Sequence, residues 1–186
     1  MKRIFDLLLA IFLIIIFFPI LFITSILVIT TSKGSILYWS SRVGKNNRIF
    51  KMPKFRTMKV NTPAVATHLL DNPQNYLTSI GGFLRKTSLD ELPQLWSVLK
   101  GDMSFVGPRP ALFNQAELIE LRKKLGVDKL LPGITGWAQI NGRDELLIPR
   151  KVKLDEEYLY RQSFYFDIKI LWLTFLKVIK SDGITH

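Results

Sequence analysis

A long apolar run near the start of the chain constrains the fold more than any other feature. Residues 7–29 read LLLAIFLIIIFFPILFITSILVI, without a charged side chain. As a helix, this run is long enough to cross the roughly 30 Å hydrocarbon core of a bilayer. It exceeds the about 7–15 apolar residues of a secretory signal peptide, and no clear A-x-A-like cleavage site follows it. The sequence therefore predicts a helix that stays in the membrane.

Pro19 lies near the middle of this run, where its ring removes a helical hydrogen bond and clashes with the preceding turn. Basic residues flank both ends, with Lys2 and Arg3 before the run and Lys33 after it. Positive charge favours the cytoplasmic side of a membrane. We therefore expect residues 1–32 to form a re-entrant helix that is broken at Pro19 and leaves on the face it entered. The alternative is a bitopic helix that tolerates the proline.

Charge and composition narrow the class of protein. The chain has 186 residues and a formal net charge of +11, and its mean hydropathy is +0.19. This combination points to a membrane or to polyanions. There is no cysteine, which excludes disulfides, thiolate catalysis and cysteine-ligated zinc. The two histidines, His68 and His186, lack metal-ligand spacing.

Residues 33–186 have the composition of one compact domain. The pattern predicts an α/β fold that is mostly helical with short strands. A hairpin is expected around Gly44 and Asn46, and residues 62–77 read as a loop or short helices. The expected strands lie at 36–39, 49–50 and 54–58, the expected helices at 94–100, 113–125 and 148–160, and a turn-rich segment at 132–143.

A further amphipathic helix is expected at 167–180, DIKILWLTFLKVIK. Apolar residues such as Leu171, Trp172 and Phe175 recur at helical spacing, with lysines along the same helix. Basic, aromatic helices of this kind lie in the membrane interface. A core-facing helix with a solvated lysine edge would show the same pattern, so both interpretations stay open.

The segment 88–95, SLDELPQL, places two acids side by side in a basic chain. Ser88 and Glu91 have the spacing of a capping box, and acids in a first helical turn are favoured by the helix dipole. Pro93 conflicts with a regular helix capped at Ser88, because it lacks the N–H that would bond the Leu89 carbonyl. Either the first turn is distorted or the helix starts later. In both cases the acids lie at a helix entrance, which also attracts phosphate.

A second segment, Gly107-Pro108-Arg109-Pro110, holds an arginine between two prolines. Fixed backbone angles lower the cost of presenting the Arg109 fork to a phosphate, although a rigid turn with an exposed arginine has the same pattern. Together with the acids and with basic residues at Lys54, Arg56 and Arg85, it predicts an anionic substrate, and a metal ion could reconcile carboxylates with phosphate. Rossmann and P-loop glycine motifs are absent from the sequence.

Five motifs carry a resemblance to a known family. They are KFRTM (54–58), RKTSLDELPQL (85–95), LKGDMSFVGPRP (99–110), PGITGWAQINGR (132–143) and a trailing LDEEY…SFYFDIKI. In this order they closely resemble the bacterial sugar transferase family, whose minimal members are small monotopic phosphoglycosyl transferases. The match covers nearly the whole chain, including the apolar N-terminal segment.

The resemblance implies transfer of sugar-1-phosphate from a UDP-sugar to a polyprenol phosphate such as undecaprenyl phosphate, with release of UMP, at the start of bacterial glycan synthesis. It implies that Asp90 is the nucleophile and forms a covalent phosphosugar intermediate. Glu91 would assist, by positioning magnesium or accepting a proton, so Asp90 and Glu91 are also the implied Mg²⁺ ligands. Arg109 would hold phosphate oxygens.

Other residues fall on family motifs with weaker assignments. Lys54, Arg56 and Arg85 are candidates for phosphate contact, and Gln139 and Arg143 for a loop that lines the nucleotide or sugar pocket. A further motif residue, Asp155, is expected to pair with a basic neighbour. The family commonly has serine before the membrane proline, where this chain has Phe18, so the angle of the break is left open.

The resemblance also implies a location at the bacterial inner membrane, with the catalytic domain facing the cytoplasm and membrane lipids as partners. A membrane-anchored module that binds polyanions or acidic lipid without catalysis is the alternative. It leaves the adjacent acids unexplained, and nucleic acid is not expected because the basic residues do not cluster in one arm or helix. The sequence specifies neither the sugar nor an oligomeric state.

Overall fold

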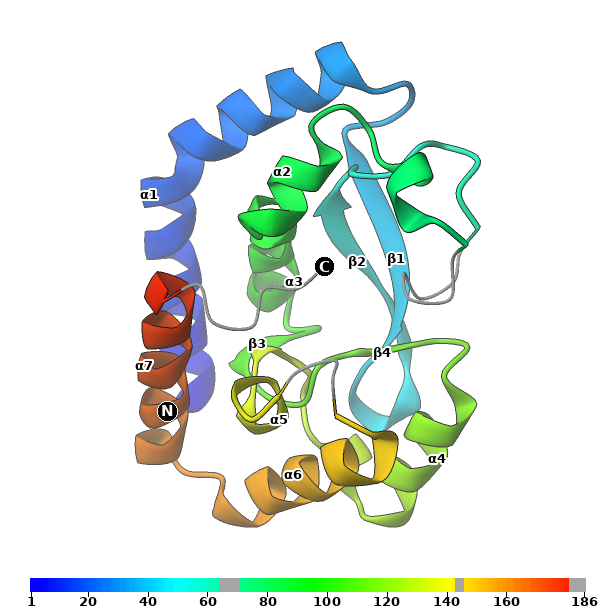
Figure 1. Cartoon of the computed structure of the whole chain (residues 1–186). Coiled ribbons are helices and arrows are strands. Elements are labelled where there is room, and N and C mark those ends of the chain that lie inside the picture. Colours follow the sequence, from blue (N-terminus) through cyan, green and yellow to red (C-terminus); the bar gives the residue numbers. More distant parts are fainter. Residues whose placement is uncertain (64–70, 143–145, 181–186) are drawn as a thin grey trace.

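The computed structural model describes residues 1–63, 71–142 and 146–180. It begins with one long helix, α1 (Lys2–Thr31), which contains Pro19. The helical backbone continues through Pro19, and the ribbon changes direction partway along α1 (Figure 1). The predicted break is therefore a bend within one helix. Among the described residues, α1 is the one helix long and apolar enough to cross a membrane.

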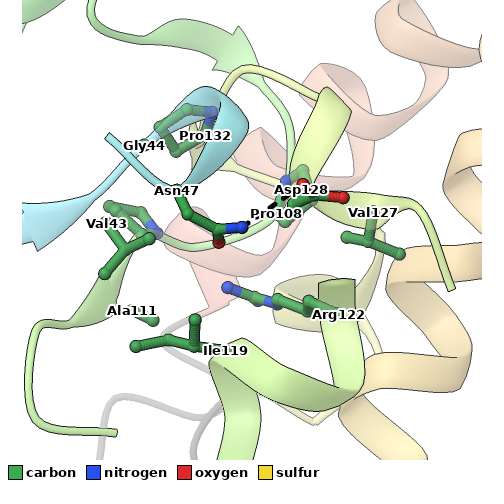
Figure 2. A pocket seen from close by; sticks show the side chains of 11 residues that line it. Val43, Gly44, Asn47, Pro108, Ala111, Ile119, Arg122, Val127, Asp128 and Pro132 are labelled. Atoms are coloured by element: carbon green, nitrogen blue, oxygen red, sulfur yellow. Dashed lines mark hydrogen bonds between the residues drawn. The ribbon is translucent and has the colours of Figure 1, made fainter. Parts of the chain in front are cut away.

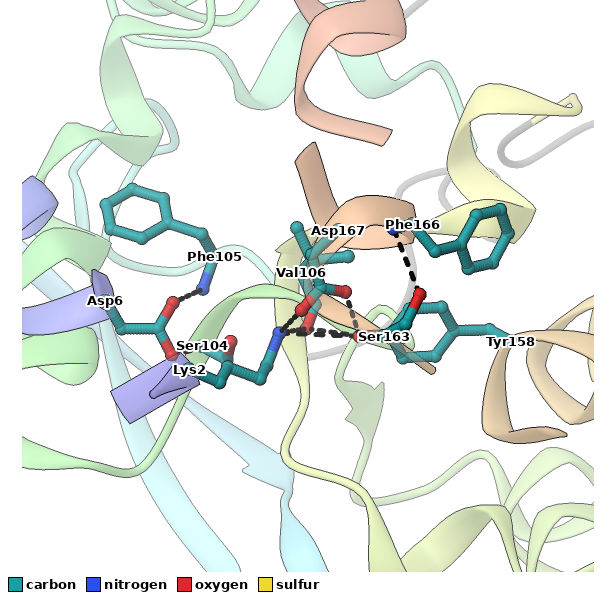
Figure 3. Close-up of polar contacts among 9 residues, drawn as sticks. All are labelled: Lys2, Asp6, Ser104, Phe105, Val106, Tyr158, Ser163, Phe166 and Asp167. Atoms are coloured by element: carbon teal, nitrogen blue, oxygen red, sulfur yellow. Dashed lines mark hydrogen bonds and ion pairs between the residues drawn. The ribbon is translucent and has the colours of Figure 1, made fainter. Parts of the chain in front are cut away.

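The N-terminal end of α1 is held against the domain by polar contacts (Figure 3). Lys2 Nζ lies 2.5 Å from Asp167 Oδ2. One turn later, the buried Asp6 carboxylate accepts hydrogen bonds from Ser104 Oγ at 2.8 Å and from the Phe105 amide at 3.2 Å. Buried polar groups of this kind need partners, and these contacts supply them. The start of α1 is thus fixed to the same domain that carries the rest of the chain.

The C-terminal half of α1 packs against that domain as well. Val28 is buried in an apolar cluster with Phe55 and Leu84. Within α1 the buried residues lie only near its two ends, whereas Phe18, Pro19 and Ile20 at the bend are exposed. The helix therefore contacts the domain on both sides of the bend and leaves the bend itself uncovered.

A small antiparallel sheet forms the platform beside the candidate site. Strands β1 (Leu37–Val43) and β2 (Ile49–Phe55) pair through a hairpin whose turn is the 3₁₀ helix η1 (Lys45–Asn47), as the sequence predicts. Strand β4 (Ala111–Leu112) adds to the other edge of β1, so the order is β2-β1-β4. This pairing places the segment that precedes β4 next to β1 and β2.

A second, two-stranded sheet joins β3 (Ser104–Val106) in parallel to β5 (Gly133–Thr135). The backbones pack closely here: a Cβ on Gly107 would lie 2.3 Å from the Leu131 carbonyl oxygen, and one on Gly136 would lie 2.1 Å from the Gly107 oxygen. Only glycine allows such contact. The glycines of the segment 132–143 therefore have a packing role.

The helices surround these sheets, and the mixed α/β fold with short strands is confirmed (Figure 1). Part of the segment 132–143 was expected as turns but forms β5 and a short helix, and the helix expected at 113–125 begins three residues later. The remaining elements are η3 (Pro73–Tyr76), α2 (Gly81–Lys86), η4 (Leu89–Gln94), α3 (Leu95–Lys100), α4 (Ala116–Lys124), η5 (Val127–Lys129), α5 (Trp137–Ile140), α6 (Ile148–Arg161) and α7 (Phe164–Lys180).

The last helix, α7, lies beside the first half of α1 (Figure 1). It buries Phe166 and Ile170 in the main core, while Trp172 and Phe175 are 58% and 54% exposed. One face of α7 therefore belongs to the core, and a separate aromatic face is left uncovered. The core-facing interpretation is thus confirmed for the buried face, and the membrane-interface interpretation of the exposed aromatic face stays a prediction.

Candidate active site

The two neighbouring acids lie in η4, a 3₁₀ helix between α2 and α3. Ser88 has a left-handed backbone (φ 56°) and makes no capping hydrogen bond through its side chain, so the capping-box interpretation is wrong. Pro93 falls inside η4, and the regular helix α3 starts at Leu95. The conflict with proline is thus resolved by a distorted first turn followed by a later helix start. An unfavourable backbone angle at Ser88 is typical of functional sites.

Asp90 is only 7% exposed, and its carboxylate has an unusual proton affinity. Burial raises the pKa of Asp90 to about 6, the nearby Lys54 ammonium opposes this shift, and the Glu91 carboxylate adds to it. Arg85 also attracts the Asp90 carboxylate. A carboxylate that is buried and yet mostly ionised near neutral pH is suited to nucleophilic or proton-transfer chemistry.

Glu91 connects three parts of the chain. Its Oε1 accepts a hydrogen bond from Lys54 Nζ of β2 at 2.7 Å, and Arg109 Nη2 lies 3.5 Å from the same oxygen. The Arg109 side chain is 40% exposed, whereas those of Lys54 and Glu91 are 17% and 24% exposed. The structure therefore brings the predicted residues Lys54, Glu91 and Arg109 together, with Asp90 as the neighbour of Glu91.

The segment that presents Arg109 is fixed by the second sheet. The Gly107 amide donates to the Thr135 carbonyl at 2.9 Å, and the Gly133 amide donates to the Pro108 carbonyl at 2.9 Å. Arg109 then lines a small, partly open cavity whose other lining residues are Arg42, Met52, Glu91, Gln94, Pro110 and Gly133. This cavity joins the arginine to Glu91, one member of the acidic pair.

The remaining predicted site residues have different surroundings. Arg85 Nε donates to Thr57 Oγ1 at 3.1 Å, and burial lowers the pKa of its guanidinium against the attraction of Asp90. Arg56 instead bonds Ser35, through Nε to the carbonyl oxygen at 2.8 Å and Nη2 to Oγ at 2.9 Å. Arg85 thus interacts electrostatically with Asp90, whereas Arg56 contacts the loop that follows α1.

Of the two loop candidates, only Gln139 lies among the residues that the structure describes. Gln139, in α5, is 6% exposed and donates to the Ile134 carbonyl at 3.3 Å. Its Oε1 is buried without a hydrogen-bond partner among the described residues. Arg143 falls outside the residues that the structure describes.

Sequence reasoning missed three residues around this site. Gln94 and Arg42 line the cavity with Glu91 and Arg109. Gln94 stands three places after Glu91, within SLDELPQL, a spacing that puts it one turn further on. Arg42 carries no such signal, because only the pairing of β1 with β4 brings it near. Arg122, whose contact with Asp155 and with the Arg109 backbone is described below, lies in an ordinary basic run on α4.

Comparison with known proteins shows the family of the chain. The Bacterial sugar transferase family matches residues 1–181. The chain is 43% identical over 99% of its length to the uncharacterized sugar transferase EpsL of Bacillus subtilis, of which it covers 90%. It is 40% identical over 95% of its length to the UDP-glucose:undecaprenyl-phosphate glucose-1-phosphate transferase of Escherichia coli. It is also 38% identical over 97% of its length to the undecaprenyl-phosphate glucose phosphotransferase of Komagataeibacter xylinus.

These relatives differ in size. The chain spans 40% of the Escherichia coli protein and 36% of the Komagataeibacter xylinus protein, whereas it spans most of EpsL. The family match nevertheless covers nearly every residue, including α1, the acidic pair and the Arg109 segment. The chain belongs to the bacterial sugar transferase family.

Proposed function

We propose that the protein transfers sugar-1-phosphate from a UDP-sugar to a polyprenol phosphate and releases UMP. The observation that carries this proposal is the buried Asp90 carboxylate beside a Glu91 that is held by Lys54 and Arg109. Two relatives are named as an undecaprenyl-phosphate glucose phosphotransferase and a UDP-glucose:undecaprenyl-phosphate glucose-1-phosphate transferase. The basic side chains of Lys54 and Arg109 can attract the phosphates that both substrates carry, and the Asp90 carboxylate can act as the nucleophile.

In the proposed first step, an Asp90 carboxylate oxygen attacks the phosphorus that is bonded to the sugar. The bond from that phosphorus to the bridging oxygen breaks, and UMP leaves with that oxygen and its electron pair. In the second step, an oxygen of polyprenol phosphate attacks the same phosphorus, and the Asp90 carboxylate leaves unchanged. A covalent intermediate lets the soluble and the lipid substrate be handled in turn.

The basic residues have separate tasks in this scheme. Arg109 is partly exposed, so its planar fork can hold two phosphate oxygens of the incoming diphosphate. Lys54 lies closer to the acids and lowers the pKa of Asp90, which keeps the nucleophile ionised. Glu91 fixes both cations by accepting contacts from them.

Magnesium is the implied cofactor, and Asp90 and Glu91 are the residues that would hold it. Among the described residues there is no group of three or more acids or histidines that could form a full metal cage. Two carboxylates nevertheless fit Mg²⁺, which commonly takes one or two protein carboxylates and completes its shell with substrate phosphates and water. When bound, the ion would neutralise charge on the diphosphate.

The membrane arrangement that fits this reaction is a re-entrant α1. A straight helix as long as α1 would span about 45 Å, yet both of its ends contact one domain, through Lys2 and Asp167 at the start and Val28 and Leu84 near the end. One domain on one side of a bilayer cannot hold both ends of a spanning helix. The exposed bend at Pro19 would enter the membrane, and Trp172 and Phe175 of α7 would lie in the interface.

This arrangement would put the reaction at the membrane surface. The positive charges that flank α1 favour a domain on the cytoplasmic face of the membrane. The nucleotide sugar is soluble, whereas the polyprenol chain is confined to the lipid. Asp90 must therefore lie close to the headgroups, and the net charge of +11 favours contact with anionic lipid.

The test of the activity is UMP release. The purified protein is incubated with Mg²⁺, polyprenol phosphate and one UDP-sugar at a time, and UMP is measured. We expect release with at least one sugar, loss of at least 10³-fold in Asp90→Asn, following typical effects of removing a nucleophile, and little change in the exposed control Asp71→Asn. Undiminished release by Asp90→Asn would refute the mechanism. Salt-dependent lipid binding with no release from any UDP-sugar would favour the non-catalytic module.

The absence of native cysteine makes the membrane arrangement directly testable. A cysteine inserted after Met1 and, separately, Lys33→Cys are labelled with an impermeant maleimide in vesicles of known orientation. The re-entrant helix predicts that both positions react from the cytoplasmic side. Labelling of the two positions from opposite sides would show a bitopic helix instead.

A further inference from the structure

The backbone around Arg109 is gripped by two other arginines. Arg122 Nη1 of α4 donates to the Arg109 carbonyl oxygen at 2.8 Å, and Arg42 Nη1 of β1 donates to the Pro110 carbonyl oxygen at 3.1 Å. Two consecutive carbonyl groups of the phosphate-binding segment thus receive hydrogen bonds from charged donors. Such bonds are stronger than those from neutral donors, and they come from elements that are distant in sequence.

Arg122 is itself locked in place by a buried acid. Its Nε and Nη2 donate to Asp155 Oδ2 at 3.0 and 2.6 Å, and the two side chains are only 9% and 2% exposed. Asp155 lies on α6, which packs against α4. Asp155 of α6 therefore fixes the Nε and Nη2 side of the Arg122 guanidinium, and Nη1 donates to the Arg109 carbonyl oxygen. The pairing expected for Asp155 is confirmed, and its partner is identified.

The location of Arg122 separates it from the chemistry. It lines a different, partly open cavity between α4, the β1 turn and the Pro108 segment, and it extends from α4 into that cavity (Figure 2). The cavity that contains Glu91 and the Arg109 side chain does not include Arg122 among its lining residues. The contact that connects Arg122 to the candidate site is therefore its hydrogen bond to the backbone carbonyl of Arg109.

The buried ion pair of Arg122 and Asp155 has a role beyond stabilising the fold. Removing two charges from water is costly, and well-packed apolar side chains of similar volume commonly serve a core equally well or better. What an apolar pair cannot do is donate a directed hydrogen bond to the Arg109 carbonyl. A side chain that must bind phosphate oxygens is sensitive to its backbone, because misplacement by about 1 Å can cost about 10²-fold in rate.

We propose that Arg122, held by Asp155, is a positioning residue that sets the pose in which Arg109 grips the diphosphate of the donor. This inference rests on the proposed function, because it assigns Arg109 to the UDP-sugar. It predicts that loss of Arg122 acts on donor binding and only through Arg109. A role confined to folding would instead reduce the amount of active protein and leave the KM for the donor unchanged.

A double-mutant cycle distinguishes these roles. The KM for the UDP-sugar is measured in the wild type, Arg122→Gln, Arg109→Gln and the double variant, with Mg²⁺ and polyprenol phosphate held constant. We expect Arg122→Gln to raise KM by about tenfold, which is less than the effect of about 10²-fold that a misplacement of about 1 Å can have. In the Arg109→Gln background, we expect it to raise KM by less than about twofold. An unchanged KM, or the same increase in both backgrounds, would overturn the proposal.

A second variant guards against unfolding. Arg122→Gln leaves Asp155 buried without its partner, whereas Arg122→Met combined with Asp155→Leu removes both charges and fills the space with apolar groups. We expect this pair to keep the melting temperature near that of the wild type and still to raise KM about tenfold. A normal KM in this folded variant would refute positioning. If the wild type itself released no UMP, the proposed function would be refuted. If it released UMP but Arg122→Gln raised KM equally with and without Arg109, only the positioning role would be refuted.

Discussion

The unusual ionisation of Asp90 predicts that removing the proposed nucleophile stabilises the protein. Asp90→Asn keeps the shape of the side chain and eliminates the charge that burial disfavours. The ordinary carboxyl pKa of 3.8 is raised to about 6 in the folded protein. Because 1.36 kcal/mol corresponds to one pKa unit, this difference corresponds to about 3 kcal/mol at a pH above both values.

The stability that Asp90→Asn gains over the wild type must increase as the pH rises. A raised folded pKa means that the stabilising contribution of Asp90 is present below pH 3.8 and is lost as the pH rises through about 6. The variant should therefore exceed the wild type by about 3 kcal/mol at pH 8 and by less than about 1 kcal/mol at pH 4. For a chain of this size, about 3 kcal/mol corresponds to an increase in Tm of roughly 6–12 °C.

Thermal unfolding in detergent micelles between pH 4 and pH 8 is the assay. The exposed control Asp71→Asn also removes one negative charge, and we expect its Tm to follow that of the wild type across the range. A difference between Asp90→Asn and the wild type that is constant with pH would refute the reasoning, because only a proton-linked charge produces the slope. A variant less stable than the wild type at pH 8 would refute it as well.

Three further predictions follow from the same contacts. The rate of UMP release without acceptor lipid should rise with pH through about 6, because Asp90 must be ionised, and Lys54→Met should move this rise to higher pH; a rate independent of pH between 5 and 8 would contradict this. Asp167→Asn should lower stability by about 1–3 kcal/mol in thermal unfolding, because it removes the partner of Lys2, and unchanged stability would show that this contact does not fix α1. Gly107→Ala should prevent normal folding, seen as a melting temperature lowered by more than 5 °C, because its Cβ would lie 2.3 Å from the Leu131 oxygen; a normal melting curve would contradict that packing.

The acidic pair shows what local sequence could predict. Two acids and a serine at capping distance predicted a helix entrance, and the proline that follows them conflicted with a regular first turn. In the structure this segment is the 3₁₀ helix η4, and the regular helix α3 begins after it. The capping box failed because Ser88 adopts a left-handed backbone, which no sequence rule assigned to a serine. Charge and spacing thus predicted the candidate site, and the left-handed backbone at Ser88 shaped its local geometry.

The contacts that complete the site come from tertiary structure. Arg42 reaches the Pro110 carbonyl only because β4 pairs with β1, and Arg122 reaches Arg109 only because α6 presents Asp155 to α4. Neither arginine differs in sequence context from a solvated one. The apolar period of α7 likewise could not separate its buried residues from its exposed ones, since apolar side chains lie on both faces of the helix.

The most direct test of the central claim is the mass of the protein after reaction with donor alone. The wild type is incubated with Mg²⁺ and one UDP-sugar, without polyprenol phosphate, and examined by intact-mass and peptide mass spectrometry. The account predicts an added mass of one sugar-phosphate, located on the peptide that contains Asp90 and absent from Asp90→Asn. Release of UMP that requires the acceptor lipid, with no adduct on the protein, or an adduct on another residue, would contradict it.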